Sequence, residues 1–289
     1  MNTKKVLLAM LAVITLTVSV YGQQYTPESN FNVVRTEGGR SATIVGYIGS
    51  STTVNIPPRI GNLPVTHIGE GAFDGKRLSS ITLPNSITHI GSRAFSNNSL
   101  TGITIPSGVK KIGAMAFMSN RLTAVTIPNG VTEIGAAAFA RNALTGVSIP
   151  SSLSVIGASV FADNALTSVS IPNSISIIGD YAFANNALTG ITIPNSVTKI
   201  GEEAFYDNRL SSVTIPNSVT IIGADGFYRN PITKITIGQN VGMGARYGNW
   251  IKTVYFNVFP NDFARFYTGT AGWRAGTFVY RNGTWTEEW

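Results

Sequence analysis

Few residues of this chain could do chemistry. The only histidines are His67 and His89, cysteine is absent, and Glu202 and Glu203 form an isolated acidic pair. Catalysis needs a nucleophile beside a base, paired carboxylates in a pocket, or a bound metal or cofactor. These residues do not supply any of those sets, so we expect that the protein is not an enzyme, has no catalytic residues and uses no cofactor.

A zinc site is the one alternative that the histidines raise. His67 and His89 are 22 residues apart, and the next residues at that spacing are Lys111 and Glu133. Zinc sites in proteins are usually built from three or four Cys, His, Asp or Glu ligands. A lysine in third place interrupts such a set, so we expect no metal site.

The same 22-residue spacing recurs in the strands and turns that must position His67 and His89. In each unit, as in the one that begins at Leu188, apolar residues alternate with small polar ones, which is typical of a strand with one buried face. Proline cannot donate to a sheet, so it ends the strand. It recurs at that spacing, at Pro84, Pro106, Pro128, Pro150, Pro172, Pro194 and Pro216. A second corner is predicted at Gly91, Gly113, Gly135, Gly157, Gly179, Gly201 and Gly223.

Two more columns share this period. One consists of Phe73, Phe95, Phe117, Phe139, Phe161, Phe183, Phe205 and Phe227. The other consists of Asn98, Asn120, Asn142, Asn164, Asn186, Asn208 and Asn230. Stacked coils of a solenoid place equivalent residues about 4.8 Å apart. The phenylalanines should therefore form one internal column, and the asparagines should satisfy backbone groups that a turn leaves unpaired.

The repeat carries a resemblance to a known family. The pattern Leu-x-x-Ile-x-Ile-Pro-x-x-Val-x-x-Ile-Gly-x-x-Ala-Phe-x-x-Asn resembles the BspA-like (Treponema pallidum-type) leucine-rich repeat and covers residues 51–250. The resemblance implies a repeat solenoid, a leucine-rich-repeat array of β-rich coils with a cap at each end. It also implies a surface or secreted binding protein, often an adhesin for host matrix proteins or other bacteria.

The two ends differ from the repeats. Residues 1–22 read as a signal peptide, because Lys4 and Lys5 precede an uncharged run over residues 6–20. That run is shorter than the roughly 20 residues of a membrane-spanning helix, so we expect an exported chain without a transmembrane helix after cleavage. Residues 23–50 should cap the first coil. Residues 251–289 are rich in aromatic residues and form either a second cap or a small binding module.

Charge is modest in total and uneven along the array. The 21 basic and 14 acidic residues give a net charge of +7, with only 12% of residues charged, which does not indicate a nucleic-acid partner. Basic residues predominate over residues 59–121 and acidic residues over 122–228. Such a field can steer a charged partner towards a rigid surface.

Candidate ligand-binding residues are the large or charged side chains on an otherwise small and neutral surface. We select Arg93, Lys110, Lys111, Tyr181, Tyr206, Tyr228, Trp273, Tyr280 and Trp285. Tyrosine, tryptophan and arginine are the residues that most often dominate binding energy at interfaces. The expected partner is an extracellular protein or a glycan, bound by a monomer.

Three other functions stay open at this stage. The chain could be a structural component of the cell envelope, or it could carry an enzyme site within residues 239–289, where acidic residues are sparse. It could also bind ice, because a threonine-rich column runs along one predicted face from Thr82 to Thr236, although the column beside it is not threonine.

Overall fold

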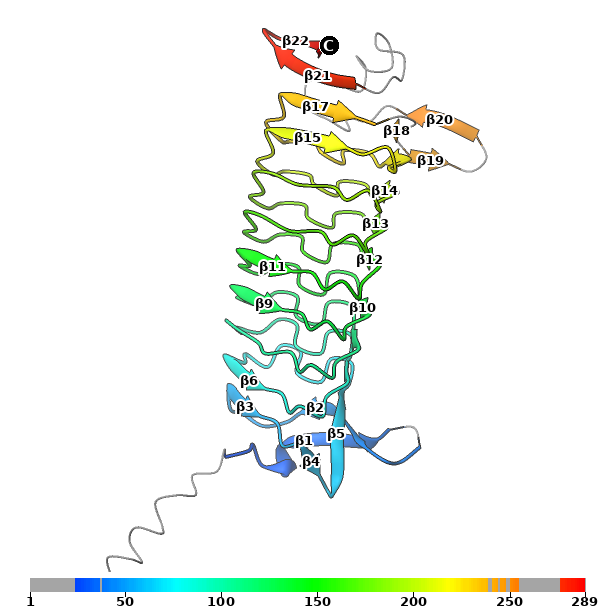
Figure 1. Cartoon of the computed structure of the whole chain (residues 1–289). Helices are drawn as coiled ribbons and strands as arrows, with labels where there is room; N and C mark the ends of the chain where they lie inside the picture. Colours follow the sequence, from blue (N-terminus) through cyan, green and yellow to red (C-terminus); the bar gives the residue numbers. More distant parts are fainter. Residues whose placement is uncertain are drawn as a thin grey trace, which may run out of the picture.

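The computed structural model describes residues 24–36, 38–238, 241–243, 245–247, 250–254 and 276–288. The predicted signal peptide and Trp273 lie outside these residues. The described chain winds into a tall stack of similar coils with the N-terminal strands at one end and a C-terminal hairpin at the other (Figure 1). Its regular elements are strands and one short 3-10 turn, η1 (Glu28–Asn30), and no described helix is long and apolar enough to cross a membrane.

The strands form two faces of the solenoid. The first face carries β3 (Thr53–Asn55), β6 (Ser80–Thr82), β9 (Ala124–Thr126), β11 (Gly146–Ser148), β15 (Ser212–Ile215) and β17 (Lys234–Ile237). The second face carries β5 (Leu63–Ile68), β7 (His89–Ile90), β8 (Lys111–Ile112), β10 (Glu133–Ile134), β12 (Val155–Ile156), β13 (Ile177–Ile178), β14 (Lys199–Ile200), β16 (Ile221–Ile222) and β18 (Gly242–Met243). Where strands of neighbouring coils pair within a face, they run parallel and match equivalent residues, as Val213 does with Ile235. The predicted solenoid of 22-residue coils is therefore confirmed.

The phenylalanine column is the centre of the core. All eight rings, from Phe73 to Phe227, are at most 1% exposed. Successive rings are stacked, with centroids between 5.1 Å and 5.9 Å apart. No coil could bury its phenylalanine without a neighbour above and below, so the core forms only when the coils stack.

The asparagine column ties each coil to the one before it. The Asn164 side chain donates to the carbonyl oxygens of Phe161 and Ala162 in its own coil and of Phe139 in the preceding coil, at 3.1–3.2 Å. Its Oδ1 accepts a hydrogen bond from the Leu144 N–H at 3.0 Å. One amide thus satisfies four backbone groups of the turn, which confirms the structural role predicted for this column.

The glycine corner is required by close packing. A Cβ on Gly91 would lie 2.7 Å from the carbonyl carbon of Gly69 in the preceding coil, and a Cβ on Gly179 would lie 2.8 Å from that of Gly157. Neither glycine has a positive φ. Close packing against the preceding coil, and not a positive φ, is therefore the reason for glycine at these two corners.

Both ends of the stack are covered by short antiparallel elements. At the N-terminal end, β1 (Phe31–Arg35) pairs with β2 (Ala42–Tyr47), and β2 continues in parallel into β5. In the first coil, β4 (Arg59–Ile60) and β5 form a small antiparallel hairpin. At the other end, β21 (Gly276–Arg281) pairs antiparallel with β17 and with β22 (Thr284–Glu288). A further pair, β19 (Ala245–Tyr247) and β20 (Trp250–Val254), precedes that hairpin.

The ladder of the second face is interrupted between β10 and β12. In the regular coils the corner glycine donates to an isoleucine carbonyl of the preceding coil, as Gly179 N–H does to Ile156 at 2.8 Å. Among the described residues, Gly157 N–H makes no such bond to Ile134. Ile134 is only partly buried, and Val155 is 41% exposed. The backbone ladder of the second face is therefore open at one boundary between coils, the one between β10 and β12.

The cause lies in two side chains of the coil that follows the break. Leu153 stands where the other coils have Val or Ile, and Val160 stands where they have Ala or Gly. Both side chains are buried, and the neighbouring ring centroids of Phe139 and Phe161 are 5.9 Å apart, the widest spacing in the column. Val160 adds volume to a coil of fixed height, and Leu153 changes the shape of the side chain beside it, so the backbone shifts and β10 separates from β12.

Replacing Val160 with alanine should close this break. Loss of two buried methyl groups from an undisturbed coil, as in Val131→Ala, should lower the free energy of unfolding by about 1–3 kcal/mol. For Val160→Ala we expect a smaller loss, because the regained Gly157 hydrogen bond offsets it by about 0.5–1.5 kcal/mol. Denaturant unfolding measures both variants, and amide exchange at Gly157 should slow towards the rate at Gly179. Equal losses in the two variants with unchanged exchange would contradict the explanation.

Candidate binding surface

Two of the candidate residues lie at a corner where the backbone is left-handed. Arg93 and Tyr181 occupy the same position of different coils, with φ of 53° and 58°. This conformation turns each N–H towards the following coil, so that Arg93 donates to Ala114 and Tyr181 to Glu202, at 2.8 Å and 2.7 Å. The same position is left-handed in every regular coil whatever its residue type. The fold therefore holds the backbone here, and the side chain points away from the core.

Three tyrosines gather on this side of the C-terminal coils. Tyr206 and Tyr228 come from adjacent coils with ring centroids 6.2 Å apart, and the Arg229 guanidinium lies 5.6 Å from the Tyr206 centroid. Tyr181, 38% exposed, shares a hydrogen bond with Glu203. We call Tyr181, Glu203, Tyr206, Tyr228 and Arg229 the tyrosine corner. It combines aromatic faces, hydroxyl groups and one charge of each sign.

Partial burial affects the titration of this corner. Desolvation raises the pKa of Tyr181, and the nearby carboxylates of Glu203 and Glu202 raise it further. Desolvation also raises the pKa of Glu203, although the hydrogen bond from Tyr181 acts in the opposite direction. The Tyr181 hydroxyl thus stays protonated and can donate a hydrogen bond over a wide pH range.

The basic candidates are split between two surfaces. Arg93 is at the left-handed corner, whereas Lys110 and Lys111 lie at and beside β8 on the second face. Lys111 Nζ is 2.8 Å from Glu133 Oε1, in an exposed ion pair. All three cations come from the stretch over residues 59–121 in which basic residues predominate. The structure places them in neighbouring coils, with the charge of Lys111 partly neutralised by Glu133.

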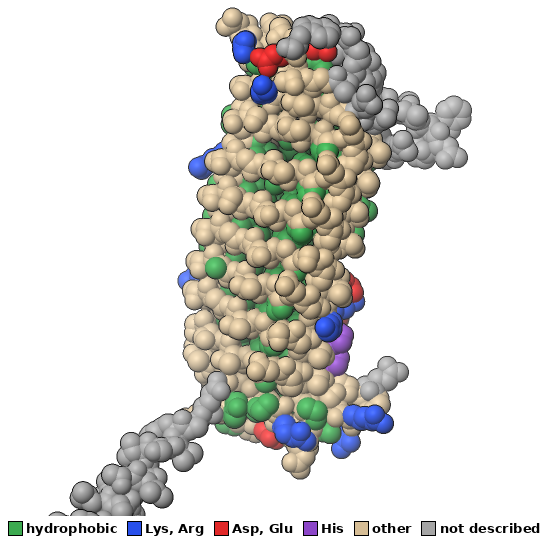
Figure 2. Space-filling model, in the orientation of Figure 1, with side chains coloured by type: hydrophobic (Ala, Val, Ile, Leu, Met, Phe, Trp, Pro, Cys, Tyr) green, Lys and Arg blue, Asp and Glu red, His purple; other side chains and the backbone are tan. Residues whose placement is uncertain are grey.

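The two histidines lie next to Lys111 on the second face. His67 of β5 and His89 of β7 are paired across the ladder, and their rings are parallel within 1° with centroids 4.5 Å apart. Burial lowers the pKa of His67, and the neighbouring His89 lowers it further. Figure 2 shows the histidines as one patch beside a small group of charged side chains. The described residues hold no group of three or more His, Cys, Asp or Glu side chains that could bind a metal.

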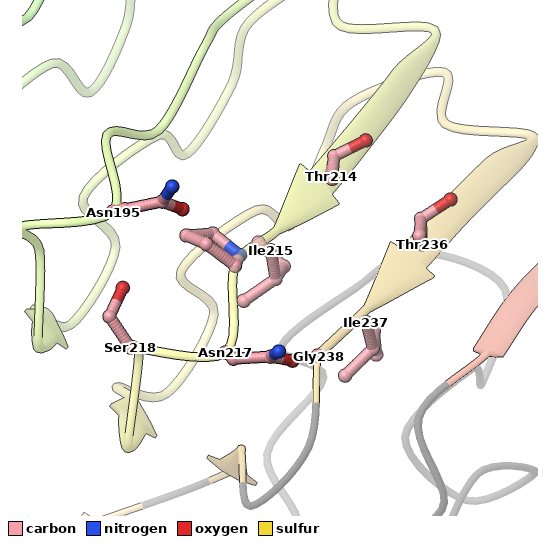
Figure 3. A pocket seen from close by; sticks show the side chains of 9 residues that line it. Asn195, Thr214, Ile215, Asn217, Ser218, Thr236, Ile237 and Gly238 are labelled. Carbon is pink, nitrogen blue, oxygen red and sulfur yellow. The ribbon is translucent and has the colours of Figure 1, made fainter.

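A hollow lies near the last coils, at the corner where the first face ends in proline. It encloses about 550 Å³, and Figure 3 shows the Thr214 and Thr236 hydroxyls side by side on neighbouring strands. Its lining consists of Asn195, Thr214, Ile215, Pro216, Asn217, Ser218, Thr236, Ile237 and Gly238. Hydroxyl and amide groups can bind sugar hydroxyls or peptide groups, but none of them is an acid or base for catalysis.

A second hollow of about 400 Å³ lies at the equivalent corner of the first coils. It is lined by Tyr25, Asn55, Ile56, Pro58, Thr82, Leu83, Pro84, Asn85 and Ser86. Neither of the two hollows nor the role of Arg229 was predicted from the sequence. The recurrence of Asn or Ser after each proline was the available signal, but it is also what a plain turn requires.

The C-terminal aromatic candidates have different surroundings. Tyr280 is partly buried and its ring centroid is 5.3 Å from that of Trp285. Trp285 is only 3% exposed, because the hairpin of β21 and β22 packs it against the last coil. The expectation that Trp285 is an exposed anchor is therefore wrong, and this side chain covers the open end of the core instead.

The left-handed corner gives a direct test of how the surface residues are held. Ala137 occupies this position with φ of 56°, whereas the first coil has Gly71 there with φ of 59°. Left-handed backbone costs a non-glycine residue roughly 1–2 kcal/mol, so Ala137→Gly should raise the free energy of unfolding by about 0.5–1 kcal/mol. Ala136→Gly, one residue earlier and outside the left-handed region, should lower it by about 0.5–1 kcal/mol. Chemical unfolding of both variants decides it, and a loss in both would show that the corner is not strained.

Comparison with known proteins gives the family. The model of the BspA type leucine rich repeat region matches residues 50–167 and 154–256 in six copies. A leucine-rich repeat protein from Bacteroides ovatus is 26% identical, with 77% of this chain and 67% of that chain covered and a TM-score of 0.60. The Treponema pallidum leucine-rich repeat protein is 25% identical over 50% of this chain and 83% of that one, with a TM-score of 0.42. No curated protein matches. The chain belongs to the BspA-type leucine-rich repeat family.

Proposed function

We propose that this chain is an exported, non-catalytic binding protein that recognises an extracellular protein or glycan, in the manner of an adhesin. The family membership supports a repeat protein that presents an extended rigid surface. Lys4 and Lys5, followed by the uncharged run over residues 6–20, support export. The absence of a nucleophile–base pair or a metal-binding cluster from the surfaces described above supports a role in binding rather than in catalysis.

The tyrosine corner is the observation that carries this proposal. Tyrosine offers a large contact area with few rotatable bonds, so ordering it on binding costs little conformational entropy. The rings of Tyr206 and Tyr228 are already held by adjacent coils and by Arg229. An aromatic face can lie against the apolar side of a sugar ring or a side chain, while the hydroxyls and Glu203 accept or donate hydrogen bonds.

Removing the three rings should abolish most of the affinity. The variant Tyr181→Ser/Tyr206→Ser/Tyr228→Ser should weaken binding at least tenfold to the strongest binder in a panel of matrix proteins, mucins and bacterial surface glycans. The control is Ile48→Ser, because Ile48 is 62% exposed at the N-terminal end of the stack and lines neither hollow. Biolayer interferometry with the chain lacking residues 1–22 measures both. Equal affinity of the triple variant and the control would exclude the tyrosine corner as the main contact.

The basic residues should act mainly on the rate of association. Arg93, Lys110 and Lys111 are all exposed, and charges on a rigid surface speed encounter with an anionic partner in a salt-dependent way. Reversing all three to glutamate should slow association with heparin about tenfold at low salt and flatten its salt dependence.

The control for charge reversal is Lys199→Glu/Arg209→Glu, which changes two exposed cations in the C-terminal half. This variant should leave association nearly unchanged. Rates measured between about 50 and 500 mM salt cover a three-fold change in screening length. A rate that is insensitive to salt in the parent chain would show that the uneven charge has no role in steering.

A further inference from the structure

The stacked histidine pair has a feature that its sequence does not reveal, which is a defined tautomer at each ring. Thr66 Oγ1 lies 2.7 Å from His67 Nδ1 and also donates its hydrogen to Ser41 Oγ at 2.8 Å. A hydroxyl carries one hydrogen, so Thr66 can only accept at the histidine. The hydrogen bond is therefore made by the N–H of His67 Nδ1.

This chain of hydroxyl groups continues in one direction. Thr36 Oγ1 donates to the Ser41 carbonyl at 3.1 Å, so the 2.7 Å contact between Ser41 Oγ and Thr36 Oγ1 uses the Ser41 hydrogen. Every hydroxyl from His67 to the final carbonyl thus donates to the next acceptor. Hydrogen bonds in such a chain strengthen one another, which fixes the His67 tautomer.

His89 has the same arrangement by a shorter route. Thr88 Oγ1 lies 2.9 Å from His89 Nδ1 and donates its hydrogen to the Thr66 carbonyl at 3.1 Å. Nδ1 of His89 must therefore carry a hydrogen as well. In both neutral rings the unprotonated nitrogen is Nε2, and each ring is only partly buried. Imidazoles that bind metals almost always have their second nitrogen donating to an oxygen in this way.

We propose that Nε2 of His67 and Nε2 of His89 together bind one divalent late transition-metal ion, such as Zn²⁺ or Cu²⁺, with water in the remaining coordination positions. Imidazole nitrogen suits these ions, whereas Mg²⁺ and Ca²⁺ prefer oxygen ligands. Two nitrogens bound to tetrahedral zinc at 2.0–2.1 Å are roughly 3.4 Å apart. The ring centroids are 4.5 Å apart and the rings are parallel within 1°, so the in-plane lone pairs of the two Nε2 atoms point in the same direction. To share one ion, each ring must rotate about its side-chain torsions until the two lone pairs converge.

The surroundings of the pair tolerate an added cation. Lys111 is the next residue in the column, but its ammonium group is 2.8 Å from the Glu133 carboxylate. The Glu133 carboxylate thus offsets the positive charge of Lys111 beside His89. With two protein ligands instead of four, the site should be much weaker than a structural zinc site, and we expect a dissociation constant in the micromolar range.

Titration of the tag-free chain lacking residues 1–22 with ZnCl₂ and CuCl₂, followed by calorimetry, tests the proposal. We expect one ion per chain, no binding of MgCl₂ or CaCl₂, and at least about a tenfold loss in His67→Gln and in His89→Gln. Far-ultraviolet circular dichroism confirms that each variant is folded. Unchanged affinity in both glutamine variants, or no heat of binding in the parent chain, would overturn the proposal.

Two further variants separate this site from adventitious binding to any exposed histidine. Lys111→His adds a third imidazole to the column and should bind zinc at least about tenfold more tightly. Lys199→His is the matched control, because it adds a histidine at the same position of β14 between Ile177 and Ile221, and it should change nothing. Equal gains in both variants would show that binding depends on the number of histidines and not on the pair.

The hydroxyl partner gives a test of the tautomer itself. Thr88→Val removes the oxygen that accepts from His89 Nδ1, and loss of such a partner typically weakens metal binding by about 10–100-fold. Thr88→Ser retains the oxygen and should restore the affinity. If Thr88→Val binds zinc as tightly as the parent chain, the hydrogen bonds do not orient the rings for a metal, and the proposal fails.

Discussion

The rest of this structure depends on backbone hydrogen bonds between equivalent positions of adjacent coils. A 22-residue coil cannot satisfy its own backbone, because its strands are only two to four residues long and pair only with other coils. The asparagine column meets this requirement at the turn after the phenylalanine, where each amide bonds to two successive coils, as Asn164 does. Stacking then brings the phenylalanines together, so backbone satisfaction and core formation occur in the same step.

The break between β10 and β12 shows what happens when a coil departs from this rule. Val160 adds volume inside one coil and Leu153 places a differently branched side chain there, and the parallel ladder separates on the second face while the first-face strands β9 and β11 stay paired. The basic residues Arg93, Lys110 and Lys111 come before the break, and the tyrosine corner comes after it. The relative orientation of the two candidate surfaces therefore depends on the coil boundary that has the weakest hydrogen bonding on its second face.

The structural features that recur in every coil could be predicted from the sequence, whereas features that depend on contacts at one place in the fold could not. The 22-residue period shows which residues of neighbouring coils are equivalent and therefore adjacent. The phenylalanine column, the asparagine column and the histidine pair could thus be predicted from the sequence. The turn at Asn282 and Gly283 could also be predicted, because Asn-Gly is a preferred sequence for a tight hairpin turn. Both residues adopt the positive φ that this turn demands. The burial of Trp285 could not, because it depends on how the terminal hairpin packs on the last coil. The tautomers of His67 and His89 could not either, since they follow from hydroxyl partners on other strands.

The division between inward and outward columns explains where function can reside in such a protein. Inward positions repeat the same residue because the neighbouring coil fixes the available volume, and Val160 shows the result of breaking that repeat. The left-handed corner makes no such demand on the side chain, since the regular bond to the next coil is made by the backbone N–H, as in Ala137. It therefore carries Arg93, Met115, Ala137, Ser159, Tyr181, Glu203 and Asp225 in successive coils without disturbing the stack. Specific recognition requires residues that differ from coil to coil on a rigid support, and this corner is where the fold permits them.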